Sequence, residues 1–382
     1  MNDEFYMDLC LKEAWKFQIL TYPNPAVGCA VLDKNGALLS VKAHEKAGFL
    51  HAEPRAIFFA LCKILPNFAS HFMREYELEF GVKFSEISEL ESANLAPNFT
   101  YDFILLHHQN ALQGAKAYVS LEPCAHKGKT PPCARLFVEL GFASVYIGAH
   151  DENKIASGGA SILKDAKIAV KMGILADKVS ALMYPFYQWQ STNFSFFKVA
   201  MTLNGKISGK ISGKISGPNS LSHMHQIRSI IDLLAIGGNT VRSDKPILDA
   251  RFAPEILEIS PKNEPKNSVK FAKNHAPDLF IYSSRRDFGA DLPLYNVPNR
   301  SVEISDNFEQ ILSRKLCMIE GGAKMLSALP NFVRYFLIYF SDDIYDKNSL
   351  NLGDNLSKNL RLKPLFLGEN GGERYGWFER EI

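Results

Sequence analysis

Two short segments restrict the fold of this chain more than any other feature of its sequence. The first contains His51 and Glu53, and the second is LEPCAHKGKTPPC, which holds Cys124 and Cys133. One imidazole and two thiolates match the three protein ligands of a catalytic zinc site, whose fourth position stays free for water. If these side chains bind one ion, the fold has to bring the helix start near residue 51 against the loop at residues 121–133.

The order H-x-E, then P-C, then a further cysteine is typical of zinc deaminases. In such enzymes zinc lowers the pKa of its water, and a glutamate that does not bind the metal carries the proton to the leaving amine. Here that glutamate is Glu53. Most deaminases have two residues between the cysteines, whereas this chain has the eight residues 125–132. Two alternatives stay open: cysteines that only pack in a core, and a structural zinc with a fourth protein ligand.

Hydrophobic patterns alternate between strand and helix along most of the chain. Strands are expected at AVGCAVLD, ALLSVKAH, AKAYVSLE, ASVYIGA, KIAVKM, FSFFKVAM, DLLAIGG, DLFIYSS, KLCMIEGG and FVRYFLIYF. Helices are expected at residues 8–18, 51–65, 132–140, near Ser161, and at 175–190, 223–231 and AKMLSAL. This alternation predicts an α/β protein with parallel or mixed sheets flanked by helices.

Three stretches interrupt the alternation. Residues 61–113 mix aromatic and acidic side chains without a clear repeat, and we expect an inserted helical or partly irregular subdomain that packs on the surface. Residues 263–275 and 342–358 are polar and are expected to be surface loops.

The length of 382 residues is long for one domain and suits two. We place the boundary near residues 191–193, which gives domains 1–192 and 193–382. The 43 basic and 41 acidic residues nearly balance, which argues against nucleic acid as a partner. No apolar stretch approaches the ~18 residues of a membrane span, and the N-terminus lacks a secretory signal pattern. Six cysteines favour a cytoplasmic protein with reduced thiols, and a homo-oligomer is compatible with the sequence.

The segments YPNPAVGCAVLD, GALLSVKAHEKAGFLHAE, LEPCAHKGKTPPC and GFASVYIGAHDENKIASGGASIL resemble the bifunctional deaminase/reductase of riboflavin biosynthesis. The resemblance implies a cytidine-deaminase-like three-layer α/β/α domain. Its reaction would be the zinc-dependent hydrolytic deamination of 2,5-diamino-6-(5-phosphoribosylamino)pyrimidin-4-one. The implied zinc ligands are His51, Cys124 and Cys133, and the implied catalytic proton shuttle is Glu53. Matching positions for contacts to the pyrimidine or its phosphate are Asn24, His44, His126 and Lys127; a turn residue before Pro25 is the alternative for Asn24.

The second half has no G-x-G-x-x-G after a strand, so the Rossmann fingerprint is absent. It has two strand-to-glycine transitions instead, LLAIGGNTVRSDKPILDAR and MIEGGAKML, and in the second Gly321-Gly322 leads directly into a helix. Backbone amides at such a helix start can cradle a dinucleotide phosphate. Two ordinary glycine turns are the alternative.

Together with FFKVAMTLNGKIS, these transitions resemble the reductase half of the same family, whose α/β fold is like that of dihydrofolate reductase. The resemblance implies NADPH as the cofactor and a hydride transfer that opens the ribose into a ribityl chain, with positioning supplying most of the catalysis. Matching positions for the cofactor are Thr240, Asp244, Gly321 and Gly322. Matching positions for the substrate are Leu248, Arg251 and Glu320. Arg251 suits a phosphate because its guanidinium is planar, Arg228 is a weaker phosphate candidate, and an ordinary surface arginine is the alternative for Arg251.

Residues 205–216 repeat the tetrapeptide GKIS three times. The period is too short for a solenoid, and it predicts a loop or hairpin tip that exposes Lys206, Lys210 and Lys214, with phosphate binding as the alternative. The family usually has aspartate-glycine where this chain has Asn204-Gly205, and a tryptophan-containing segment that is not found here. A deaminase with a degenerate reductase domain is therefore an alternative to the bifunctional enzyme, and a deaminase of nucleic-acid bases is a less favoured one.

Deleting two of the three GKIS units should leave hydrolytic deamination unchanged, because the repeat lies in the second predicted domain. Ammonia release from the phosphoribosyl pyrimidine by the purified variant measures this. A collapse of deamination would show that the division at residue 192 is wrong.

Overall fold

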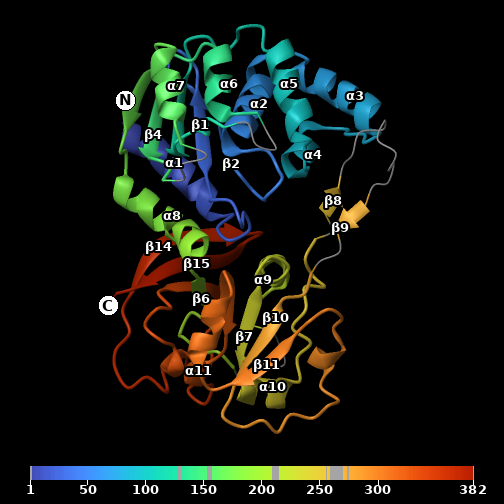
Figure 1. Cartoon of the computed structure of the whole chain (residues 1–382), viewed down its shortest axis with the longest axis vertical. Coiled ribbons are helices and arrows are strands. Elements are labelled where there is room, and N and C mark those ends of the chain that lie inside the picture. The colour runs from blue at the N-terminus through green and yellow to red at the C-terminus, as the bar shows by residue number, and fades with distance from the viewer. Residues whose placement is uncertain are drawn as a thin grey trace. The chain divides into compact units, whose positions relative to one another are not determined.

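The computed structural model describes residues 2–126, 131–152, 157–208, 215–254, 256–258, 270–272 and 275–381 (Figure 1). Its contacts divide the chain into two compact units, Met1–Tyr184 with Ile256–Ala272, and Pro185–Glu255 with Lys273–Ile382. Helix α8 (Ala176–Ser191) runs across the point of division, and the first strand of the second unit begins at Phe194. The functional boundary at residues 192/193 therefore stays a prediction.

The first unit is built on a five-stranded sheet in the order β2-β1-β3-β4-β5. Its strands are β1 (Gly28–Leu32), β2 (Leu38–Ala43), β3 (Lys116–Leu121), β4 (Ser144–Ala149) and β5 (Ala169–Met172). Strand β1 pairs antiparallel with β2 and β3, whereas β3, β4 and β5 are parallel. All five residues of β1 are buried, as expected for a strand that is covered on both faces.

Helices cover both faces of this sheet (Figure 1). The helices are α1 (Asp3–Trp15), α2 (Ala52–Ile64), α6 (Cys133–Glu139), α7 (Gly159–Asp165) and α8. On one face, Val31 and Val119 join the buried cluster that α2, α6 and α7 share. On the other, a Cβ added to Gly28 would lie 2.0 Å from the Cys10 carbonyl oxygen of α1, so glycine permits the close approach of this helix. The predicted three-layer α/β/α domain is confirmed.

The insert at residues 61–113 forms three helices, α3 (Phe68–Phe80), α4 (Ile87–Ser92) and α5 (Pro97–His107). Its aromatic side chains do not stay on the surface. Phe72 is fully buried, and its ring lies 4.6 Å from that of Phe58 in α2 and 5.1 Å from that of Phe103 in α5. The insert thus extends the core of the first unit, which differs from the surface subdomain that the acidic residues suggested.

The second unit contains an eight-stranded sheet in the order β11-β10-β7-β12-β6-β13-β15-β14. Its strands are β6 (Phe194–Thr202), β7 (Leu233–Gly237), β10 (Asp278–Tyr282), β11 (Val302–Ser305), β12 (Leu316–Glu320), β13 (Tyr335–Ser341), β14 (Leu362–Asn370) and β15 (Glu373–Arg380). The six strands from β11 to β13 are parallel, so β7, β10 and β12 end at one edge. The helical segments are α9 (Pro218–Arg228), α10 (Gly238–Asp244), α11 (Ala323–Ala328), and the 3-10 turns η1 (Pro293–Asn296) and η2 (Phe308–Ser313).

Two further features complete the chain. The antiparallel hairpin β14–β15 was not predicted from the sequence. Its turn lies at Gly371-Gly372, where both φ angles are positive, and a glycine pair of this kind is a typical hairpin turn. The short strands β8 (Ile256–Glu258) and β9 (Lys270–Ala272) pair antiparallel; most of the expected loop at residues 263–275 lies outside the described residues. Among the described helices, none combines the length and the apolar character needed to cross a bilayer.

Replacing Phe72 by alanine should lower the free energy of unfolding by about 3–5 kcal/mol, because a buried ring is removed from a packed aromatic cluster. Chemical denaturation of the purified variant measures the change. The matched control is Leu106→Ala on α5, whose side chain is 77% exposed and should shift stability by less than about 0.5 kcal/mol. Equal effects of the two substitutions would contradict the insert's place in the core.

Candidate functional site

Three elements bring the predicted metal ligands together. His51 is the extended residue that precedes α2, Cys124 follows β3 in a loop, and Cys133 is the first residue of α6. Two of these positions are at the start of a helix, and the third follows the end of a strand. The side chains therefore project from element ends rather than from the middle of a packed face.

The distances among the three side chains suit one tetrahedral ion. The His51 Nδ1 atom lies 3.8 Å from the Cys124 sulfur and 3.4 Å from the Cys133 sulfur, and all three donor atoms lie within 4.8 Å of one another. Two atoms bound to a tetrahedral zinc through bonds of about 2.3 and 2.05 Å lie about 3.6 Å apart. The donor set and its spacing thus fit zinc, and no fourth protein ligand joins the group among the described residues.

The charges in this centre also suit a cation. The hydrogen bond from Cys133, together with His51, lowers the pKa of the Cys124 thiol to about 4, and the Cys133 backbone N–H donates to the same sulfur at 3.3 Å. A thiolate is the form that binds a metal. Glu53 is buried in the first turn of α2, and burial, followed by the charge of Cys124, raises its pKa to about 7.

A buried carboxylate that the sequence analysis did not single out holds the cysteine loop. Glu122 is only 4% exposed, and it accepts hydrogen bonds from the backbone N–H groups of Ala160 at 2.9 Å, Gly158 at 3.1 Å and Asp151 at 3.3 Å, and pairs with His150. The available signal was its place in LEPC, directly after a buried strand. Glu122 ties the end of β3 to the start of α7 and so positions the next two residues, Pro123 and Cys124.

Two other contacts support the same loop. A Cβ on Gly159 would lie 1.8 Å from the Pro123 carbonyl oxygen, so only glycine lets α7 approach the loop this closely. From the insert, the Tyr101 hydroxyl of α5 donates to the carbonyl of Pro132, the residue before Cys133, at 3.3 Å. The insert thus contributes to the position of the second cysteine.

Asn24 and His44 lie together beside the metal centre. Burial and the neighbouring His51 lower the pKa of His44 to about 4, so its ring is neutral. Because the Leu50 carbonyl can only accept, the His44 Nδ1–H donates to it at 2.9 Å, and the Nε2 atom accepts from the Asn24 amide at 3.2 Å. This pair orients the Asn24 amide. Of the other loop candidates, His126 is exposed and Lys127 lies outside the described residues.

In the second unit, a cavity of about 520 Å³ lies where β7, β10 and β12 end. Thr240 and Gly322 line it, as do hydroxyl and amide side chains that include Asn239 and Ser243. Its volume is in the usual range for cofactor sites. A Cβ on Gly322 would lie 2.8 Å from Ile207, so this glycine admits the first GKIS unit beside the cavity. Helix α11 after it has only six residues, so its dipole is small.

The remaining candidates lie on the same unit but in different surroundings. Glu320 forms a two-pronged ion pair with Arg228, at 2.8–3.0 Å, so this arginine is already occupied. Arg251 is 45% exposed and pairs with Asp249 at 2.9 Å. The last three candidates do not line the cavity. Leu248 is buried, and Asp244 is exposed at the end of α10. Gly321 packs against Met325.

The segment that departs from the family pattern is well structured where it is described. The Asn204 amide nitrogen donates to the Tyr345 carbonyl at 2.7 Å, and its oxygen accepts from the Tyr345 N–H at 3.2 Å. An aspartate could not make the first of these bonds, since an ionised carboxylate has no donor. Lys206 donates to the Ser349 carbonyl at 2.7 Å, and Lys210 and Lys214 lie outside the described residues.

Comparisons with known proteins agree with this geometry. The family model "Cytidine and deoxycytidylate deaminase zinc-binding region" matches residues 1–149. Two solved structures share the fold over nearly the full chain. The deaminase/reductase from Thermotoga maritima has a TM-score of 0.57 at 22% identity and covers 99% of both chains. RibD of Acinetobacter baumannii has a TM-score of 0.56 at 23% identity and covers 100% of this chain and 99% of its own.

Sequence relatives extend over both units. The riboflavin biosynthesis protein RibD of Haemophilus influenzae is 32% identical over 385 residues, which span 92% of this chain and 89% of that protein. RibD of Aquifex aeolicus is 25% identical over 404 residues, spanning 99% and 98%. The chain therefore belongs to the RibD family of riboflavin biosynthesis proteins.

Proposed function

We propose that the chain catalyses two successive reactions of riboflavin biosynthesis. The first is the zinc-dependent hydrolytic deamination of 2,5-diamino-6-(5-phosphoribosylamino)pyrimidin-4-one, and the second is the NADPH-dependent reduction of the ribose to a ribityl chain. The observation that carries this proposal is the convergence of His51, Cys124 and Cys133 beside a buried glutamate. Membership of the RibD family supports the coupling to a reductase.

In the first reaction, we assign the zinc ligands to His51 Nδ1 and the sulfurs of Cys124 and Cys133. Zinc in such a site supplies an activated water near neutral pH. With zinc bound, Glu53 would take a proton from the attacking water and deliver it to the departing nitrogen. An interaction of the Glu53 carboxyl group with Cys133 supports this proton transfer.

Substrate recognition in the deaminase site is assigned to Asn24 and His44. The neutral His44 ring accepts one N–H of the Asn24 amide, which leaves the second N–H and the carbonyl oxygen of that amide for a pyrimidine edge. An amide with both a donor and an acceptor suits the ring nitrogen and carbonyl oxygen of the substrate. His44 thus acts as a positioning residue for Asn24.

In the second reaction, we assign the cofactor to the cavity at the ends of β7, β10 and β12, which Thr240 and Gly322 line. Asp244 and Gly321, which do not line this cavity, are further candidate contacts to the cofactor. NADPH supplies the hydride. Substrate contacts are assigned to Leu248, Arg251 and Glu320. The Arg228 pair lowers the pKa of Glu320 against the opposing effect of burial, so its carboxylate stays charged and can accept hydrogen bonds from sugar hydroxyls.

The setting proposed for the enzyme is the cytoplasm, with a small phosphoribosyl pyrimidine as its substrate. None of the six cysteines forms a disulfide, as is usual in a reducing compartment. The near balance of 43 basic and 41 acidic residues favours a small molecule over nucleic acid.

Replacing Cys124 by serine should abolish stoichiometric zinc binding, because a hydroxyl is a much poorer zinc ligand than a thiolate. Metal analysis after dialysis against a weak chelator measures the content. Cys62→Ser is the matched control, since Cys62 lies on α2 outside the ligand cluster and should leave zinc in place. Full zinc content in the Cys124 variant would contradict its assignment as a ligand.

Replacing Glu53 by glutamine should keep the zinc and reduce the deamination rate by about 10³-fold, because the amide cannot carry the proton. The measurement is ammonia release paired with metal analysis of the same sample. Near-normal turnover would refute the role of Glu53, and loss of zinc would refute the assignment of this residue as a group that does not bind the metal.

A further inference from the structure

Three side chains on the insert at residues 61–113 are of the metal-binding type and have no role in the assignments above. His71 and Glu75 come from α3, and His107 is the last residue of α5. All three are partly exposed. We call these three residues the histidine cluster.

Helical spacing places His71 and Glu75 on one face of α3. Residues four apart in a helix are neighbours, and the His71 Nε2 atom lies 3.5 Å from a Glu75 carboxylate oxygen. His107 of α5 lies beside them, because the centre of its ring is 4.4 Å from that of His71, at an interplanar angle of 68°. Two helices of the insert thus bring donor groups to one place on its surface.

The separation of the two imidazole rings suits a shared metal ion. A metal bound to an imidazole nitrogen at about 2.05 Å lies about 3.2 Å from the ring centre, so two imidazoles on one ion at about 90–110° have centres about 4.5–5.2 Å apart. The observed 4.4 Å is close to this range. Among the described residues, only the deaminase ligands already have three donor atoms within 4.8 Å of one another. The histidine cluster therefore closes on an ion by side-chain rotation, for which Glu75, at 39% exposed, has room.

The surroundings hold both rings and keep their nitrogens available. Phe103 is 4% exposed, and its ring centre lies 5.3 Å from that of His71 and 4.4 Å from that of His107. Burial, followed by the charge of His71, lowers the pKa of His107, so at neutral pH its ring is neutral, which is the form that binds a metal. The His107 side chain forms no hydrogen bond with any other residue in the described part of the chain.

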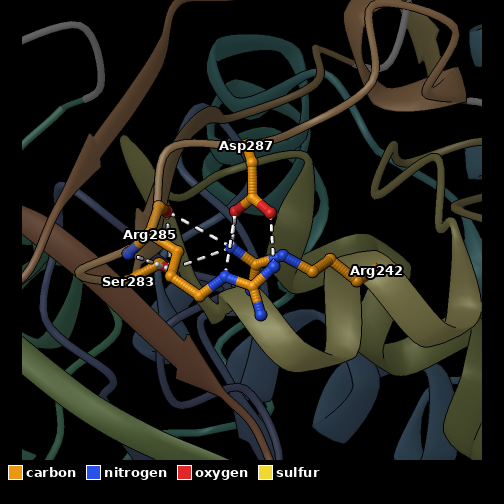
Figure 2. Close-up of polar contacts among 4 residues, drawn as sticks. All are labelled: Arg242, Ser283, Arg285 and Asp287. Atoms are coloured by element: carbon orange, nitrogen blue, oxygen red, sulfur yellow. Dashed lines mark hydrogen bonds and ion pairs between the residues drawn. The ribbon is translucent and has the colours of Figure 1, made fainter.

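The charged groups at the rim of the cavity in the second unit are, by contrast, already paired with one another. Arg242 and Arg285 both donate to the Asp287 carboxylate (Figure 2). In the histidine cluster, the described partners of the Glu75 carboxylate are one imidazole and the exposed Arg74, at 3.3 Å. Such surface pairs contribute little free energy, so Glu75 is available to a stronger cation.

We propose that His71, Glu75 and His107 bind a divalent transition-metal ion of the zinc class, at a second metal site that shares no ligand with the deaminase centre. Two imidazoles and one carboxylate form a ligand set that zinc accepts, with water completing the coordination. Imidazole donors disfavour calcium and magnesium, which prefer oxygen ligands. An ion bound there links α3 to α5, the helix whose Tyr101 hydroxyl contacts Pro132 beside the second cysteine.

The test is zinc binding by the full-length protein, measured as zinc per chain after equilibrium dialysis against increasing free zinc. The wild-type protein should bind two ions, one in the deaminase centre and a weaker one in the histidine cluster. His107→Ala should weaken the second ion by more than about tenfold, because one of three protein ligands is lost, and should retain the first. His108→Ala is the matched control. It removes the neighbouring imidazole, whose Nδ1 atom already accepts from the Asn110 N–H at 3.1 Å, and should retain both ions.

The zinc of the deaminase centre reports that each variant is folded. As a second measurement, further zinc added to the zinc-loaded protein should raise the melting temperature of the wild type and of His108→Ala, but not of His107→Ala. Equal weakening of the second ion by the two substitutions would overturn the assignment of the ligands. A single zinc per wild-type chain that Cys124→Ser removes would overturn the inference, whereas a single zinc that His107→Ala removes would support it and refute the deaminase centre.

Discussion

The deaminase half depends on the anchoring of one loop by a buried carboxylate. Glu122 accepts hydrogen bonds from the backbone N–H groups of Asp151, Gly158 and Ala160, which are far from it in sequence. A buried charge is tolerated only when such donors surround it. The same bonds fix the direction in which the chain leaves β3, and therefore the place of Cys124 beside His51. The position of the metal centre thus depends on the hydrogen bonds that Glu122 accepts just after the end of β3.

The ends of parallel strands play the corresponding part in the second unit. Because β7, β10 and β12 run in one direction, their carboxyl ends place Gly237, Tyr282 and Glu320 along one edge of the sheet. This edge is where ligands bind in open α/β sheets. Most residues that line the cavity lie at these ends or follow them, and Glu320, the last residue of β12, pairs there with Arg228 of α9.

Local patterns in the sequence predicted most of the strands and helices of both units, because buried strands and amphipathic helices have periods that are visible over a few residues. The metal ligands were predictable for a different reason: few chemical roles need one histidine, two cysteines and a glutamate in that order. The structure of the insert at residues 61–113 was predicted less accurately. Its acidic residues suggested a surface subdomain, but acids on one side of a helix do not reveal that Phe72 and Tyr76 on the other side are buried.

The sequence by itself determined the type of chemistry and the α/β class, since both follow from residue identity and from short-range periodicity. Tertiary structure alone decided which side chains work together. The anchoring of the cysteine loop by Glu122, the Tyr101 contact to Pro132 and the ion pair of Arg242 with Asp287 join positions 31 to 45 residues apart. Such pairings depend on how strands and helices pack, and no local pattern in the chain encodes them.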